Sequence, residues 1–180
     1  MTKFFAATLA ILLLALSARA EPNAVEAVLI KQFLVCEGEL QAGCESFGKS
    51  AFSDALIVFT GAAENGNIAA RNNLGMLYET GAGVKRSDKK AARLYGVAAD
   101  AGVPIAQYNL AMLTVTKHVI GEVTDPAERD ADMATAYMWL TFASEQGLKL
   151  AIESKQELVE FMTDGALKTG KRRVKVKRGK

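Results

Sequence analysis

The chain of 180 residues has few of the side chains on which metal sites and nucleophilic catalysis depend. It contains a single histidine, His118, and two cysteines, Cys36 and Cys44. A structural zinc site needs about four nitrogen or sulfur ligands, more than these residues supply. His118 has no serine or cysteine nucleophile near it in the sequence, and we interpret it as a surface-loop residue. We find no catalytic constellation and expect neither a metal nor a cofactor.

What the sequence does have is an internal repeat with a period of 36 residues between positions 62 and 113. Seven residues return unchanged at this offset: Ala63, Gly66, Ala70, Asn73, Leu74, Met76 and Leu77 recur as Ala99, Gly102, Ala106, Asn109, Leu110, Met112 and Leu113. A period of this length is typical of stacked supersecondary units, because one unit cannot bury its apolar face alone. The sequence therefore predicts an array of similar units.

The residues within one period predict two helices and two connections. Small residues flank a turn at 64–67, and apolar residues at helical spacing follow it. Gly81 and Gly83 can adopt the positive φ that ends a helix. Ser87 is placed to cap the next helix, whose apolar stripe contains Leu94 and Tyr95. The unit is a helix, a loop, a helix and a turn.

These residues resemble the Sel-one-like repeat family, a relative of the tetratricopeptide repeat. The resemblance rests on the run at 70–78, the Gly81-Ala82-Gly83-Val84 loop and the positions 90–91, 94–95, 98–99 and 102, and it extends over roughly 35–151. It implies an all-α fold, an α/α superhelix of antiparallel helix pairs with about three units and terminal capping helices. It also implies a scaffold that binds other proteins.

The N-terminal 20 residues fit a cleaved secretory signal. Lys3 precedes an apolar core over 4–16, and Ala18-Arg19-Ala20 matches an A-x-A cleavage site. The apolar core is too short to span a bilayer permanently. The predicted organisation is a signal peptide at 1–20, a repeat domain at 21–165 and a basic, disordered tail at 166–180. We expect a periplasmic or secreted protein with no transmembrane segment after cleavage.

The first unit contains Cys36 and Cys44, which flank an expected turn between helices after an apolar helix predicted at 24–35. Their Cα atoms could lie within bridging range, and an exported protein would meet an oxidising compartment. A structural disulfide is the favoured interpretation, with two buried free thiols as the alternative. The family resemblance supports the disulfide.

The outer units depart from the reference length. When Gly48 is aligned with Gly75, the first unit lacks nine residues, which predicts a tight turn near 50–54 in place of the glycine loop. The third unit has a surplus of nine residues at 116–130. There, Asp125-Pro126-Ala127-Glu128 has the pattern of a capping box. We expect a short extra turn before a main helix that is capped at Asp132.

Two short motifs resemble those of penicillin-recognising enzymes: Ser46-Phe47-Gly48-Lys49 has S-x-x-K spacing, and Lys168-Thr169-Gly170 spells K-T-G. In those enzymes the lysine motif lies on a strand, whereas here it begins a basic tail after a helical body. Coincidence is the favoured interpretation, and a cell-wall or penicillin-binding protein with weak β-lactamase-like hydrolysis is the alternative function. Gly81-Ala82-Gly83 follows a helix and is not interpreted as a nucleotide loop.

Binding is expected on the concave face that the first helices of successive units form. The candidate partner-binding residues are Arg71, Asn72, Gln107 and Tyr108. Asn73 and Asn109 belong to the repeated pattern, and we interpret them as hydrogen-bonding to backbone. Tyr95 and Trp139 occupy equivalent aromatic positions and are assigned to the core.

Charge is divided unevenly along the chain. Residues 21–167 carry 12 basic and 20 acidic residues, whereas 168–180 carry 8 basic and no acidic residues. The tail candidates for an anionic partner are Lys171, Arg172, Arg173, Lys175, Lys177 and Arg178. The alternatives are that the tail folds onto the acidic body or aids solubility, and nucleic acid is the least favoured partner. The function expected overall is a non-enzymatic exported adaptor, in envelope assembly, signalling regulation or host interaction.

Overall fold

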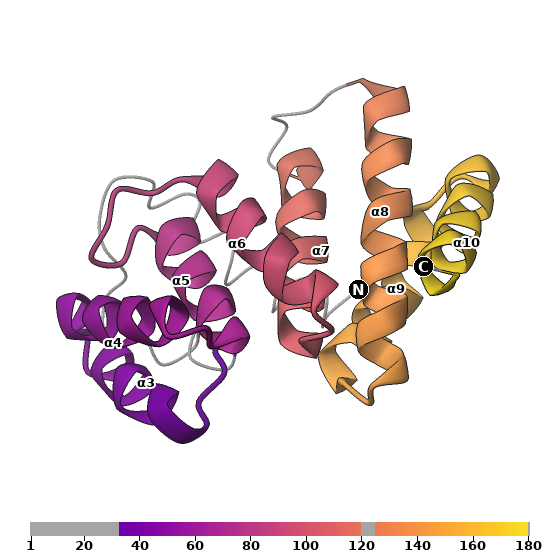
Figure 1. Ribbon diagram of the computed structural model, residues 1–180. Helices are drawn as coiled ribbons and strands as arrows, with labels where there is room; N and C mark the ends of the chain where they lie inside the picture. The colour runs from indigo at the N-terminus through magenta and orange to yellow at the C-terminus, as the bar shows by residue number, and fades with distance from the viewer. Residues whose placement is uncertain (1–32, 120–124, 180) are drawn as a thin grey trace.

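The elements of the structure, a computed structural model that describes residues 33–119 and 125–179, are all helical. In chain order they are the 3-10 helix η2 (Gly38–Leu40) and the α-helices α3 (Gln41–Gly48), α4 (Phe52–Glu64), α5 (Ile68–Thr80), α6 (Asp88–Asp100), α7 (Pro104–Val119), α8 (Pro126–Glu145), α9 (Lys149–Phe161) and α10 (Asp164–Arg178). Consecutive helices pack against each other from α3 to α9, and α10 packs on α8 at the far end of the array (Figure 1). The predicted all-α solenoid of helix pairs is confirmed.

The 36-residue period is visible in the turns that connect one unit to the next. Gly66, Gly102 and Gly147 have φ of 91°, 90° and 84°. The residue after each glycine donates its N–H to a carbonyl five positions earlier, Asn67 to Ala62, Val103 to Ala98 and Leu148 to Ala143. This is the glycine-terminated helix end in which a positive φ lets orphan carbonyls find donors. Gly147 comes 45 residues after Gly102, as the predicted surplus of nine requires.

Close helix packing within the hairpins depends on glycine facing an aromatic ring. A Cβ on Gly75 in α5 would lie 2.6 Å from Tyr95 Cε1 in α6, and one on Gly43 in α3 would lie 2.5 Å from Phe59 Cε1 in α4. Both rings are fully buried, as predicted for Tyr95. The missing side chain therefore lets each pair of helices approach closely enough to enclose the ring.

This packing corrects the predicted register of the first unit. Gly43, and not Gly48, takes the role of Gly75, because α3 is only eight residues long and ends at Gly48. The turn after α3 is short, as expected: Ser50 has φ 59°, and Ala51 donates its N–H to the Ser46 carbonyl. The short first helix accounts for part of the shortening that the sequence predicted for this unit.

The third unit differs from its prediction in one respect. Asp125 caps the helix as expected, because its side chain accepts from Ala127 N, and Pro126 opens the first turn. However, α8 runs without interruption to Glu145, so the predicted extra turn before a second helix capped at Asp132 is wrong. The surplus residues lengthen α7 and α8, with 16 and 20 residues against 13 in each of α5 and α6.

The prediction of a disordered tail at 166–180 is wrong for the part of the tail that the structure describes. Residues 164–178 form α10, which packs on α8. Thr163 caps the helix by accepting from Ala166 N at 3.1 Å. Asp164 lies in the first turn and basic residues lie in the last, the arrangement that the helix dipole favours. Gly170 lets α10 approach α8, because a Cβ there would lie 2.8 Å from Tyr137 Cδ1.

Two expectations fall on other parts of the chain. The predicted signal peptide lies outside the described residues, as does most of the helix predicted at 24–35. Leu34, Val35 and Cys36, the described residues at that helix's C-terminal end, are not helical. Among the described residues, no helix has the length and apolar composition that crossing a membrane requires.

We predict that Gly75→Ala destabilises the protein by about 1–3 kcal/mol, because the new methyl group must displace the Tyr95 ring. The matched control is Gly96→Ala in α6, where a Cβ would meet nothing within 4 Å. That change should stabilise by about 0.5–1 kcal/mol through helix propensity. Urea unfolding measures both variants. Equal effects of the two substitutions would contradict the proposed helix contact.

Candidate partner-binding surfaces

Helices α5 and α7 hold a segment of the same chain, residues 33–35. Asn73, in α5, pairs with Val35 through both groups of its side-chain amide. Val35 N donates to Asn73 Oδ1 at 2.8 Å, and Asn73 Nδ2 donates to the Val35 carbonyl at 2.8 Å. The amide thereby satisfies one backbone donor and one backbone acceptor, as a neighbouring strand would. The interpretation of Asn73 as a backbone ligand is confirmed.

Two further asparagines bind Phe33, which lies two residues before Val35 in the same segment. Asn72 Nδ2 and Asn109 Nδ2 donate to the Phe33 carbonyl at 2.9 and 3.1 Å. Asn109 Nδ2 also donates to Asn72 Oδ1 at 2.9 Å, which links α5 to α7. Asn72, Asn73 and Asn109, called here the asparagine clamp, are all buried. Buried amides are costly without partners, so the segment at 33–35 completes this part of the core.

Apolar and covalent contacts reinforce the asparagine clamp. The Phe33 ring stacks on Tyr108 of α7, with centroids 5.9 Å apart and planes 2° from parallel. Burial raises the pKa of Tyr108 above its ordinary value. Immediately after the segment, Cys36 lies at disulfide distance from Cys44 of α3, with a Cα separation of 5.8 Å. The favoured disulfide interpretation of the two cysteines is thereby supported.

These contacts correct most of the predicted partner-binding set. Asn72 and Tyr108 hold the chain's own segment and are fully buried. Gln107 is 4% exposed, donates to the Ala99 carbonyl and accepts from Gln146 Nε2. The expectation that these three side chains are free on the surface is wrong, because Phe33 contacts Asn72 and Tyr108, and Ala99 and Gln146 engage Gln107. Arg71 keeps partial exposure, and its buried Nε has no acceptor among the described residues.

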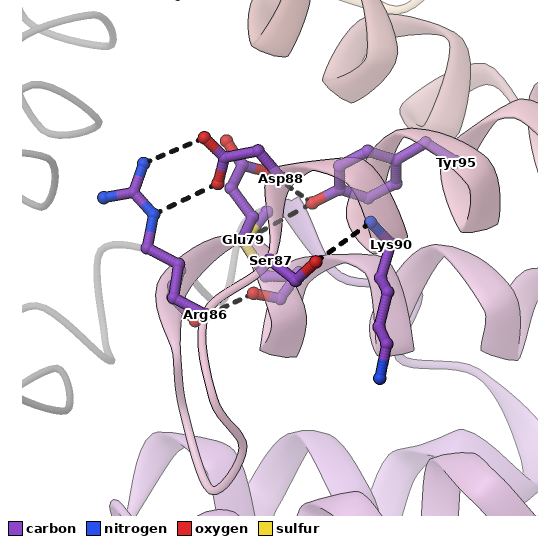
Figure 2. Close-up of polar contacts among 8 residues, drawn as sticks. Glu79, Arg86, Ser87, Asp88, Lys90 and Tyr95 are labelled. Carbon is purple, nitrogen blue, oxygen red and sulfur yellow. Dashed lines mark hydrogen bonds and ion pairs between the residues drawn. The ribbon is translucent and has the colours of Figure 1, made fainter.

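A second polar cluster lies where the glycine loop joins α5 to α6 (Figure 2). Tyr95 donates its hydroxyl to Glu79 Oε2 at 2.6 Å. Arg86 forms a two-pronged pair with Asp88, at 3.1 and 3.2 Å. Ser87 caps α6 as predicted, by accepting from Lys90 N at 3.3 Å. The cluster fastens both ends of the loop, and the pattern analysis of the sequence did not identify Glu79.

The electrostatics of this cluster favour a neutral Glu79. Burial raises the pKa of Glu79 from its usual 4.5 to about 7, against the lowering effect of the Tyr95 hydrogen bond. Asp88 raises the pKa further and Arg86 lowers it. Burial, together with the neighbouring Glu79, also raises the pKa of Tyr95 well above its ordinary value. Glu79 therefore changes charge near neutral pH.

His118 is not the surface-loop residue predicted. It lies in the last turn of α7, its side chain is 5% exposed, and its Nε2 is 3.0 Å from Asp132 Oδ2 in α8. Asp132, which we predicted to cap a helix, lies within α8 and pairs with His118 of α7. Within residues 33–119 and 125–179, we find no group of three potential metal ligands.

The two motifs that resemble penicillin-recognising enzymes are not brought together. Ser46 lies in α3, and Lys168-Thr169-Gly170 lies inside α10. These helices are at opposite ends of the array of helices (Figure 1). The lysine motif is helical, not on a strand, and Gly170 is buried against α8. Nothing in this geometry joins the serine and the lysine motif in one site.

The six cations proposed for an anionic partner all lie on α10 and fall into two groups. Arg173 donates to the Ala131 carbonyl at 2.7 Å and to Thr135. Lys177 pairs with Asp100 at 2.6 Å and lies 4.6 Å above the centroid of Trp139, while Arg178 pairs with Glu145. These three fasten α10 to α6 and α8. Lys171, Arg172 and Lys175 remain exposed.

Fold and surfaces together define a helical-repeat protein in which α5 and α7 hold a segment of the same chain. The Sel1 repeat family model matches residues 68–103, 104–116 and 121–148, which begin at α5 and end after α8. A sel1-like repeat-containing protein of Acanthamoeba polyphaga mimivirus is 30% identical over 98 residues, 54% of this chain and 18% of that protein. This chain thus spans less than a fifth of that relative. No solved structure matches the present chain significantly. The matched parts of this chain, between residues 68 and 148, are thus similar to Sel1 repeats.

We predict that Asn73→Ala destabilises the protein by about 2–3 kcal/mol, because Val35 loses the partners of its buried N–H and C=O. The control is Asn65→Ala, at an exposed position after α4, which should change stability by less than about 0.5 kcal/mol. Urea unfolding measures both. An Asn73→Ala variant as stable as the control would contradict the asparagine clamp.

We predict that stability falls as pH rises from about 4.5 to about 7, because the folded state holds the Glu79 proton that the unfolded state releases. This contribution to stability is fully present below the pKa of Glu79 in the unfolded state, and it is lost as the pH rises through the pKa of Glu79 in the folded state. Its upper limit is about 3 kcal/mol, and partial solvent contact of Glu79 reduces it.

The test of this pH dependence is Glu79→Gln, which keeps an acceptor for the Tyr95 hydroxyl and removes the titration. Urea unfolding between about pH 5 and about pH 8 should show a flatter profile for this variant than for the wild type. The exposed Glu64→Gln serves as the charge control and should keep the wild-type slope. A slope unchanged by Glu79→Gln would contradict the assignment.

Proposed function

We propose that this chain is an exported, non-enzymatic adaptor that binds another protein through its Sel1-repeat solenoid. Sel1 repeats suggest a protein-interaction scaffold, and they are present in α5 to α8. The asparagine clamp already holds main-chain atoms of the chain's own segment. The observation that carries the proposal is therefore the partial exposure of Arg71, which precedes Asn72 in α5.

The segment at 33–35 fills the groove between α5 and α7, so a partner must bind beside it. Arg71 is the only one of the four predicted partner-binding residues that keeps partial exposure. A guanidinium at the edge of a buried region favours a carboxylate or carbonyl oxygen. We therefore assign the protein contact to the Arg71 edge of the groove.

Export is part of the same proposal. The N-terminal pattern of a basic residue, an apolar core and an A-x-A site supports it. The cysteine pair at disulfide distance also supports it, because disulfides persist in oxidising compartments. Envelope assembly, signalling regulation and host contact are the settings in which such an adaptor would act. We also propose an anionic envelope surface as a second partner, bound by the basic residues of α10.

We predict that crosslinking in intact envelopes followed by purification captures one protein in stoichiometric amount with the wild-type chain. Arg71→Ala should reduce the captured amount about tenfold, since arginine contacts are often energetic centres of interfaces. Arg93→Ala, at an exposed position of α6, is the matched control and should capture as much as the wild type. Capture by Arg71→Ala at the level of the control, or turnover of cell-wall material by the purified chain, would contradict the proposal.

A further inference from the structure

The outer face of α10 carries four cations in one row. Lys168, Lys171, Arg172 and Lys175 are all exposed. Their spacing of three, four and seven residues places them on the same side of the helix. None has a hydrogen bond or ion pair with any residue that the structure describes, in contrast to the three cations that fasten the inner side. These four residues are called the cationic row.

The cationic row is not needed to hold α10 in place. Its attachment comes from Ala166, Gly170 and Val174, which are buried, and from the inward cations. Within the row, cations three and four residues apart repel one another and weaken the helix slightly. Three cations of α10 bind other helices, whereas the four of the cationic row repel one another. An anion bound to the outer face would neutralise this repulsion.

An exposed apolar group beside the cationic row indicates which anion it binds. Val176, 57% exposed, lies one helical turn beyond Arg172 in α10. Basic residues accompanied by exposed apolar side chains are typical of surfaces that rest on lipid headgroups. A site for single-stranded nucleic acid would instead place aromatic rings for base stacking among the cations, and the row contains none.

The shape of the surface agrees with a planar partner. Four residues spanning seven positions of a straight helix extend about 10 Å along one line. Helix α10 is at the outer end of the array, and its other side packs on α8 (Figure 1). The row can therefore face a flat surface without obstruction from the other described helices.

We propose that the cationic row binds phosphate-bearing lipid headgroups of an anionic membrane and holds the solenoid against its surface. This inference deepens the proposed anionic contact of the basic segment and does not depend on the protein partner at Arg71. Each cation near such a surface strengthens binding about fivefold, so the complete row provides at least about a hundredfold preference for anionic over neutral lipid.

The experiment is vesicle flotation with the full chain. The vesicles contain phosphatidylcholine alone or with about 30% phosphatidylglycerol, at low and at high salt. The test variant is Lys168→Gln, Lys171→Gln, Arg172→Gln and Lys175→Gln combined. The control, Lys85→Gln, Lys89→Gln, Arg93→Gln and Lys149→Gln combined, removes the same charge from exposed positions elsewhere. Binding through the apolar N-terminal stretch occurs with both vesicle types and is removed by comparison.

We expect the wild type and the control to prefer anionic vesicles in a salt-dependent manner, and the test variant to lose at least about 50-fold of that preference. Far-ultraviolet circular dichroism confirms that α10 is retained; if it is not, the pairs Lys168/Lys171 and Arg172/Lys175 are substituted separately. The proposal is overturned if the test variant binds like the control, or if the wild type has no preference for anionic lipid. It is also overturned if the row binds polyglutamate or duplex DNA more tightly than the vesicles.

Discussion

The structure depends on side-chain amides that take the place of a neighbouring strand. Asn72, Asn73 and Asn109 lie where α5 and α7 face each other, and none of these side chains could be buried there without hydrogen-bond partners. The segment at 33–35 supplies those partners, and in return its own backbone groups are satisfied. The asparagine side chains and the backbone of residues 33–35 can therefore be buried only together. The cysteine pair and the Phe33–Tyr108 stack keep the two sides together.

This mutual burial divides the surface of the protein. A helical repeat normally offers its concave face to a partner, but here the groove between α5 and α7 is occupied by the same chain. The two contacts proposed for other molecules lie at Arg71 in α5 and on the outer side of α10. The first favours a single oxygen acceptor of a protein, and the second favours a surface with many negative charges. Because the two contacts favour different kinds of partner, they can be tested separately.

Much of the fold could be predicted because it recurs along the chain. The identities at an offset of 36 correspond to equivalent turns, and Gly66 and Gly102 have nearly the same φ. The role of Asn73, the cap at Ser87 and the burial of Tyr95 and Trp139 followed from the same pattern. The helix α10 was missed because its inner side consists of Ala166, Gly170 and Val174, which give a weak apolar stripe among many cations. The first unit was misaligned because α3 is short.

The contact between residues 33–35 and the asparagine clamp could not be predicted. No periodic signal links these residues to asparagines that lie 38 to 76 positions later. The most direct test of this contact is native-state hydrogen exchange of the Val35 amide, which donates to Asn73 Oδ1. We expect this amide to exchange as slowly as the core amides of α5, through global unfolding. Exchange at the rate of an exposed residue such as Glu37 would contradict it.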